Sequence, residues 1–193
     1  MVKRKTQKSK VLAQAKKIKA AGFGSLGVLF SATVWFDSEK GEVQRVRSHV
    51  DGQGISLLRG IGLRICFVTA TGDNFLPKFA EKLNSLPSAK SGKWPKVDVF
   101  VQAAGEGKVK VVGNWLKKLG LAWDECAFMG DDLGDYPVMK KVGLAACPAG
   151  AEKIIKDIAH FTASREAGSG AVRDFCNLLL QAKRVDPTSL PLN

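Results

Sequence analysis

The sequence predicts an α/β protein whose mainly parallel sheet is covered by helices on both faces. Short runs of almost entirely apolar residues recur along the chain, as in parallel strands that are buried on both sides. Segments with helical spacing of apolar residues alternate with these runs, which is the pattern of a parallel α/β sheet. No apolar run approaches the roughly 20 residues that span a bilayer, which argues against a membrane protein.

The first half of the chain gives five expected elements. Apolar spacing predicts a helix over 11–21, and a glycine-rich apolar run predicts a strand over 22–30 that enters a turn. Alternation around the turn residues 37–41 predicts a β-hairpin over 32–49. A helix is expected over 51–59, and a buried strand over 65–68 that ends at Thr69.

The second half continues the alternation. A helix is expected over 75–86, a polar loop over 87–95 and a strand over 97–101. The remaining expected elements are a helix over 108–119, a strand over 126–129, a helix over 135–142, a strand over 144–147, and helices over 151–158 and 171–182.

Three carboxylates follow the strand over 126–129. Asp131, Asp132 and Asp135 lie directly after Gly130, where a parallel strand would deliver them to the carboxyl edge of the sheet. Clustered hard oxygen ligands suit magnesium. The alternative is a solvated acidic turn in which Asp132 or Asp135 caps a helix.

Other strand ends are expected to meet these acids. Thr69 follows one strand, Lys108 starts a helix after another, and 24–29 follow the first. A hydroxyl, an ammonium group and carboxylates at one sheet edge predict a phosphate site with magnesium: Thr69 and Lys108 bind phosphate, and Asp131 holds the metal. Each residue also has an ordinary structural alternative, since Thr commonly caps a helix and Lys is commonly solvated.

The net charge of +12 is unevenly distributed. Eight cations precede the first acid, Asp37, and this arm suggests a polyanion partner such as RNA. A solvated tail and a mitochondrial presequence remain alternatives. The predicted division is an arm over 1–21, a domain over 22–183 and a tail over 184–193. The cations of the arm are Lys3, Arg4, Lys5, Lys8, Lys10, Lys16, Lys17 and Lys19.

Cysteine usage indicates a reducing setting. The four cysteines are widely spaced and form no Cys-x-x-Cys pair, which disfavours zinc and disulfides. No signal peptide is visible, because 20–29 is broken by glycines. We therefore expect an intracellular and cytoplasmic protein, with mitochondrial and nuclear locations left open.

Several motifs together resemble the haloacid dehalogenase superfamily. They are the hairpin after the first strand, the segment 51–58, Val68-Thr69, Lys108, and the segments 130–135, 141–144 and 170–173. The resemblance is to the small capless branch of the superfamily, which includes 3-deoxy-D-manno-octulosonate 8-phosphate phosphatase and the carboxyl-terminal domain of CMP-acylneuraminate synthetase. It implies a three-layer, Rossmann-like fold and a homotetramer that packs through the hairpin 32–49.

One motif departs from the family pattern. The resemblance aligns Gly27-Val28-Leu29 with the family's Asp-x-Asp-Gly-Val-Leu, so that Gly24 and Leu26 occupy the nucleophile and acid/base positions. Neither side chain attacks phosphorus or transfers a proton, and magnesium would lose a ligand. We therefore predict a non-catalytic assembly or binding subunit on a phosphatase-like fold. The alternatives are a magnesium-dependent sugar-phosphate phosphatase and a sensor that binds a phosphorylated sugar.

Overall fold

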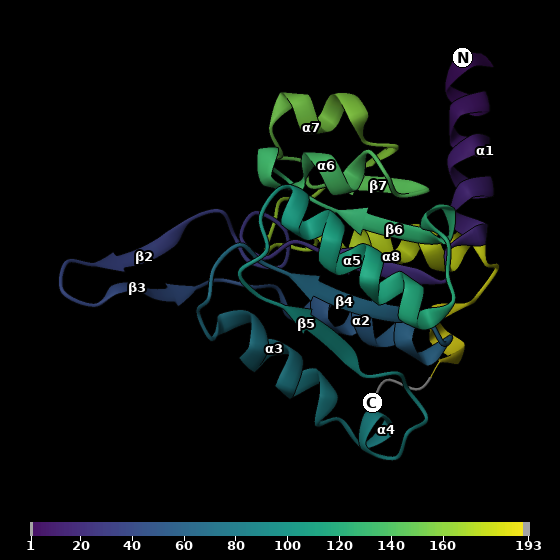
Figure 1. Cartoon of the computed structure of the whole chain (residues 1–193). Coiled ribbons are helices and arrows are strands. Elements are labelled where there is room, and N and C mark those ends of the chain that lie inside the picture. The colour runs from purple at the N-terminus through teal and green to yellow at the C-terminus, as the bar shows by residue number, and fades with distance from the viewer. Residues whose placement is uncertain (1, 191–193) are drawn as a thin grey trace.

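The centre of the protein is a six-stranded parallel sheet (Figure 1). The computed structural model describes residues 2–190, with side chains from residue 9 onward. In spatial order the strands are β5 (Val97–Phe100), β4 (Arg64–Val68), β1 (Ala20–Phe23), β6 (Cys126–Met129), β7 (Leu144–Cys147) and β8 (Phe161–Thr162). The predicted fold class is confirmed.

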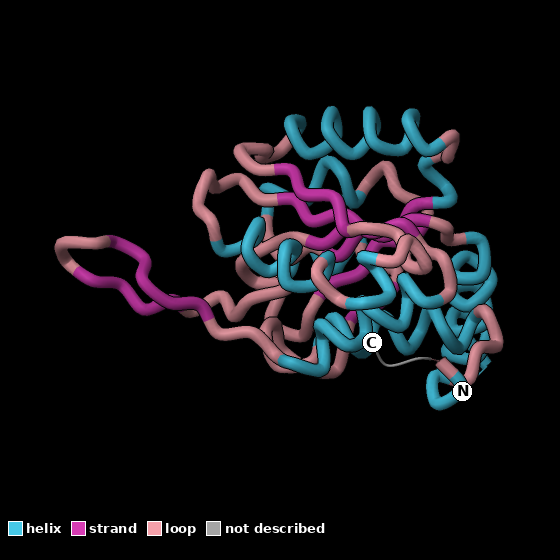
Figure 2. Tube along the Cα trace, turned by 90° about the horizontal axis from the view of Figure 1, so that it is seen from below, coloured by secondary structure: helices cyan, strands magenta, loops and turns pink. Residues whose placement is uncertain are grey.

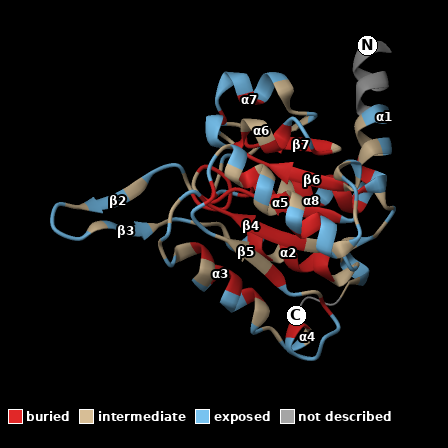
Figure 3. Ribbon diagram, viewed as in Figure 1, coloured by how far each residue is buried: buried red, intermediate tan, exposed pale blue. Residues whose placement is uncertain are grey.

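Helices cover both faces of this sheet. One face carries α1 (Val2–Lys17), α2 (His49–Gly60), α3 (Phe75–Asn84) and α8 (Ala171–Ala182). The other face carries α5 (Glu106–Leu119), α6 (Tyr136–Met139) and α7 (Lys153–Ile158). Buried residues concentrate in the strands and on the helix faces that contact them (Figure 3). None of the helices in 2–190 is both long and apolar enough to cross a membrane.

The order of the strands creates a switch point. From β1 the chain moves to β4 and β5 on one side, and then returns to β6, β7 and β8 on the other. The connections after β1 and β6 therefore diverge at the carboxyl edge of the sheet and leave a crevice between them. The carbonyl of Ser25 shapes the connection after β1, because it accepts hydrogen bonds from the backbone N–H groups of Val28, Leu29 and Phe30.

The predicted hairpin is present and projects from the body of the protein. Its strands are β2 (Val34–Asp37) and β3 (Gly41–Arg45), and both views show it standing clear of the other elements (Figures 1 and 2). Arg45 anchors its base, because its Nη2 lies 2.7 Å from Asp73 Oδ2 and its guanidinium lies 4.5 Å from the centre of the Phe75 ring. The hairpin is therefore tied to the loop that follows β4.

Several predicted elements differ from those of the structure, in their boundaries or in their presence. The helix predicted over 11–21 ends at Lys17, and the strand predicted over 22–30 is β1. Ala20 and Ala21 favour helices as residue types, but pairing with both β4 and β6 overrides this preference. The loop predicted over 87–95 contains α4 (Pro87–Lys90), and the two residues of β8 were missed.

The predicted arm is partly folded into the body. Ala15 and Ile18 are fully buried in the core, and the strand β1 begins within the arm. The described structure thus includes 15–21 in the main fold. The division into arm, domain and tail otherwise stays a prediction.

A buried arginine holds the connection between α3 and β5. Arg59 is 0% exposed, and it donates hydrogen bonds to the carbonyl of Pro95 at 2.7 Å and to that of Leu83 at 3.0 Å. Its Nη2 also lies 3.3 Å from Asn84 Oδ1, and its guanidinium lies beside the ring of Trp94. No carboxylate within the described structure forms a salt bridge with this cation, so neutral acceptors carry the whole interaction.

Replacing Arg59 tests this arrangement. We expect Arg59→Met to lower the free energy of unfolding by about 2–4 kcal/mol, because buried carbonyl acceptors would lose their donor. The measurement is urea unfolding followed by circular dichroism. The control is Lys118→Met on the exposed side of α5, which removes the same charge. Equal effects of the two changes would contradict the assigned role.

Candidate active site

The predicted strand ends meet in one cleft at the carboxyl edge of the sheet. Its volume is about 350 Å³. Thr69, Lys108 and Asp131 all line it, together with residues 25–27 of the connection after β1. The structure thus places together the groups that the sequence assigned to a phosphate site. Their roles in binding stay a prediction.

Thr69 lies at the end of β4 and is 4% exposed. Its Oγ1 is 2.9 Å from Thr71 Oγ1 and accepts a hydrogen bond from the backbone N–H of Thr71 at 3.2 Å. A pair of hydroxyls has two protons, and only one is used between them. The Thr71 hydroxyl also hydrogen-bonds to the carboxylate of Asp73, so a phosphate in the cleft would compete with Asp73 for the second proton. Thr71, which also lines the cleft, was not a predicted site residue.

Lys108 and Asp135 form a buried ion pair. The Nζ of Lys108 lies 2.5 Å from Asp135 Oδ1, and the two residues are 6% and 3% exposed. The other carboxylate oxygen of Asp135 accepts the backbone N–H of Asp131 at 3.1 Å. Gly130 is required beside this pair, because a Cβ at that position would overlap the Asp135 side chain. Lys108 has three donors, so it can still bind an anion while it is paired with Asp135.

Asp131 is the carboxylate that the cleft perturbs most. The pKa of Asp131 is raised to about 7: burial contributes most, the charges of Asp135 and Asp132 add to it, and Lys108 opposes the shift. The carboxylate of Asp131 lies directly over Gly27, whose φ is +71°, and a Cβ on Gly27 would overlap it. The glycine therefore serves both the turn and the space that Asp131 occupies.

Asp132 has a capping role. It is exposed, and its Oδ1 accepts the backbone N–H of Leu133 at 2.6 Å. This is the capping alternative that the sequence left open for this acid. No group of three His, Cys, Asp or Glu residues within 2–190 is arranged to hold a metal ion. The predicted set Asp131, Asp132 and Asp135 is therefore not a closed metal site.

The donor set still fits magnesium in a shared site. All three acids line the cleft, but Asp135 is paired with Lys108 and Asp132 accepts a backbone N–H, so Asp131 is the acid that we assign to a metal. Magnesium is commonly held by one or two carboxylates together with substrate phosphate and water. A divalent cation would also relieve the like-charge repulsion that raises the pKa of Asp131.

The connection after β1 carries no ionisable group in the cleft. Gly24 donates its N–H to the carbonyl of Met129 at 2.9 Å, and a Cβ built on Gly24 would lie 3.5 Å from Asp135 Oδ2. Leu26 lines the cleft and packs partly against the core. Ser25 between them was missed by sequence analysis: it lines the cleft, and its buried Oγ has no hydrogen-bond partner within the described structure.

Among the cations whose side chains the structure describes, Lys10, Lys16, Lys17 and Lys19 do not line this cleft. Lys19 forms an ion pair with Glu125, at 2.6 Å, and the carbonyl of Lys16 accepts a hydrogen bond from Lys183. The side chains of Lys3, Arg4, Lys5 and Lys8 lie outside the described residues. A polyanion partner for this helix stays a prediction.

Comparison with known proteins identifies the family. The haloacid dehalogenase-like hydrolase family matches residues 63–175, which is more than half of the chain. The chain belongs to this family. The matched segment contains Thr69, Lys108 and Asp131, and it begins after Gly24 and Leu26.

Individual relatives agree with this assignment. The 3-deoxy-D-manno-octulosonate 8-phosphate phosphatase of Salmonella typhi is 38% identical over 85 residues, which cover 44% of this chain and 45% of the relative. The match thus spans less than half the length of that protein. A Legionella pneumophila structure assigned to subfamily III A of the superfamily has a TM-score of 0.84 and 27% identity, and covers 95% of this chain and 93% of its own.

A further neighbour was solved with ligands. The 3-deoxy-D-manno-octulosonate 8-phosphate phosphatase of Moraxella catarrhalis was crystallised with magnesium, phosphate and a KDO molecule. It has a TM-score of 0.80 and 22% identity, and covers 91% of this chain and 93% of its own. At this identity the likeness shows a shared fold.

These comparisons correct the predicted function. The sequence analysis predicted a non-catalytic binding subunit, but the curated relatives and the ligand-bound neighbour are named as phosphatases. That prediction was wrong. The prediction gave more weight to Gly24 and Leu26, which lie outside the segment that matches the family. It gave less weight to Thr69, Lys108 and Asp131, which lie inside that segment.

The raised pKa of Asp131 predicts a pH-dependent stability. An unfolded Asp ionises near 3.8 and the folded one at about 7, so ionisation costs folding free energy that grows between these values and is constant above them. We expect Asp131→Asn to stabilise the protein by ~1–2 kcal/mol at pH 8, after discounting for partial exposure, and the gain to vanish near pH 4.

Thermal unfolding between pH 4 and pH 8 measures this effect. Asp132→Asn is the control, because Asp132 is exposed and an Asn still caps Leu133. A gain from Asp131→Asn that is the same at both ends of the pH range would show that its origin is not the ionisation of this carboxyl.

Proposed function

We propose that this protein is a magnesium-dependent phosphomonoesterase that acts on a phosphorylated sugar acid. The convergence of Thr69, Lys108 and Asp131 in one cleft carries the proposal. Together they supply a hydroxyl donor, a cation and a hard oxygen ligand, which suit a dianionic phosphate.

The cleft recognises the phosphate group through complementary charge. Lys108 is held by Asp135, so its ammonium group is fixed before the substrate arrives and little rearrangement is needed. One hydroxyl of the Thr69–Thr71 pair, at the end of β4, would donate to a phosphate oxygen. Magnesium bound at Asp131 would neutralise further negative charge on the phosphate.

Hydrolysis in this cleft would use water as the nucleophile. Gly24 has no side chain and Leu26 has no ionisable group, so neither can form a covalent phosphoryl intermediate. The water oxygen would form the new bond to phosphorus as the bond from phosphorus to the ester oxygen breaks. The water proton would pass to a carboxylate of the cleft, and the leaving alkoxide would take a proton from solvent.

The substrate class follows from the relatives. Those that match this chain are named for 3-deoxy-D-manno-octulosonate 8-phosphate, a phosphorylated sugar acid. The donors and charges of the cleft support a phosphate group on that substrate. An intracellular setting fits this proposal, because all four cysteines are free thiols and buried.

Phosphate release tests the proposed function. We expect hydrolysis of 3-deoxy-D-manno-octulosonate 8-phosphate and of p-nitrophenyl phosphate with magnesium, and loss of turnover with EDTA. Asp131→Ala should lower kcat by about 100-fold, because the metal ligand is lost.

Asp157→Ala on the exposed side of α7 is the matched control and should keep full activity. The proposal fails if the wild-type protein releases no more phosphate than buffer with magnesium. It also fails if Asp131→Ala and Asp157→Ala are equally active, because the turnover then comes from a contaminant.

We also propose that copies of this chain assemble through the hairpin. Four large apolar residues of this segment are exposed, and Trp35 and Phe36 have exposed fractions of 66% and 73%. A projecting strand pair with such side chains is typical of an interaction surface. The others are Val43 and Val46. The resemblance to the capless branch favours a homotetramer.

Charge substitution on the hairpin tests this assembly. Light scattering after gel filtration should give a tetramer for the wild type and a monomer for the double variant Trp35→Lys with Phe36→Lys, because charged side chains oppose burial of the surface. Ile154→Lys, at another exposed apolar residue, should remain tetrameric. A monomeric wild type would refute the assembly.

A further inference from the structure

A second cavity lies between α2 and α3, away from the candidate active site. Its volume is about 190 Å³, and none of its lining residues lines the cleft at the sheet edge. Its principal walls are Arg47, His49, Gly52, Phe79, Lys82 and Leu83. The lining combines basic and apolar side chains.

Arg47 supplies a cation without an acidic partner. Its guanidinium lies 4.5 Å from the centre of the Phe79 ring, and its Nη1 approaches only the carbonyl of Ser48, at 3.5 Å. No salt bridge within the described structure includes Arg47 or Lys82. The fork of a guanidinium matches the geometry of a carboxylate, so Arg47 is suited to pair with one.

The acids near this cavity are occupied elsewhere. Asp51, on the first turn of α2, accepts hydrogen bonds from the backbone N–H groups of Gly170 and Arg173 and so faces α8. Glu81 on α3 is paired with Lys78, at 2.8 Å. The charge that faces the cavity is therefore positive.

The floor of the cavity is apolar and has room for a ligand. Phe79 and Leu83 are 5% and 6% exposed. Gly52 leaves the space between the two walls open, because a Cβ on it would lie 3.6 Å from Arg47 Nη1 and 3.6 Å from Phe79 Cζ. An aromatic ring or a branched alkyl group fits such a surface, next to a cation that would bind its charged end.

We propose that this cavity binds a small organic monocarboxylate with an aromatic or branched apolar body. The carboxylate pairs with Arg47, and Lys82, which also lines the cavity, adds positive charge. The apolar body lies against Phe79 and Leu83. The site differs in chemistry from the phosphate cleft, because it lacks hard oxygen ligands and has an apolar floor.

Fluorine NMR with 4-fluorophenylacetate tests the proposal on the 193-residue chain. The probe should bind with a dissociation constant of about 1 mM, as expected for a small fragment. Arg47→Gln should weaken binding about fivefold through loss of a charge-assisted contact. Gly52→Ala should also weaken it, because the added methyl group enters the cavity without a steric clash.

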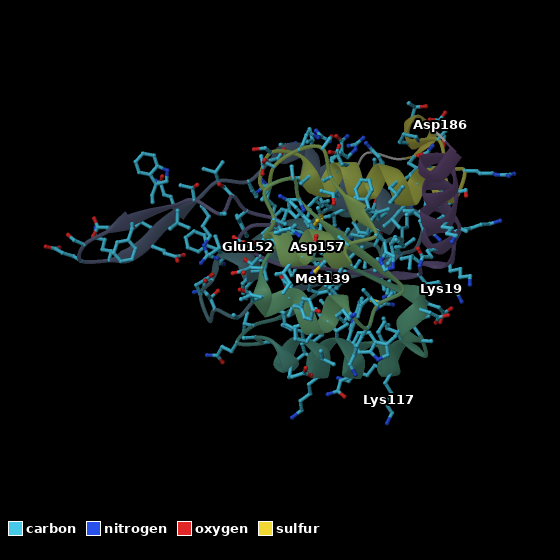
Figure 4. All side chains as sticks on the ribbon, turned by 90° about the horizontal axis from the view of Figure 1, so that it is seen from above. Lys19, Lys117, Met139, Glu152, Asp157 and Asp186 are labelled. Carbon is cyan, nitrogen blue, oxygen red and sulfur yellow. The ribbon has the colours of Figure 1, made fainter. Side chains whose placement is uncertain are left out.

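Two controls separate this site from general attraction of anions. Lys117→Gln removes a charge from α5, where Lys117 extends away from the body (Figure 4), and should leave the affinity unchanged. The neutral analogue 4-fluorophenylacetamide should bind at least about fivefold more weakly than the acid.

The proposal is overturned if the acid does not bind at about 10 mM. It is also overturned if Lys117→Gln weakens binding as much as Arg47→Gln does. Thermal unfolding of each variant shows whether it is folded under the conditions in which its affinity for the probe is measured. If Arg47→Gln is unfolded, Gly52→Ala decides the question.

Discussion

The buried ion pair between Lys108 and Asp135 organises the carboxyl edge of the sheet. It joins the start of α5 to the turn after β6, and Asp135 also holds the backbone N–H of Asp131. Removing one partner would leave an uncompensated charge in a nearly solvent-free position, which costs several kcal/mol. The pair therefore fixes both the cation that faces the cleft and the backbone that presents Asp131. Gly130 is a consequence of the same constraint, since no side chain fits beside Asp135.

The cleft is well packed, but it holds one carboxyl group, that of Asp131, in surroundings that disfavour its ionisation. Asp131 is surrounded by two other acids and by the apolar turn after β1, and these surroundings disfavour its charged form. Such an arrangement is common where a protein binds a cation or moves a proton, because the ligand or the reaction offsets the cost. A family relationship alone assigns a fold and a general chemistry. The phosphate chemistry that we propose for this chain rests on the positions of Thr69, Lys108 and Asp131 in one cleft.

Much of this site could be predicted from the sequence, because strand ends in a parallel sheet converge. Thr69, Lys108 and Asp131 each follow an apolar run, and topology brings them together. The hidden features depend on partners distant in sequence. Nothing in the sequence indicates that Asp135 pairs with Lys108. Nothing in it indicates that the hydroxyl of Ser25 is buried beside the cleft. The end of α1 was misplaced because Ala20 suits a helix until two strands pair with it. The two residues of β8 are too few to show a period.

Arg59 of α2 also affects how the connection between α3 and β5 responds to proteolysis. Lys90, Lys93 and Lys96 are exposed on this connection and would be accessible to trypsin. The two ends of the segment, however, are joined by Arg59 and by a pair of hydrogen bonds between Asn84 and Val97, at 2.8 and 3.0 Å. A chain cut at these lysines would therefore stay together as one particle, and its fragments would separate only in denaturant.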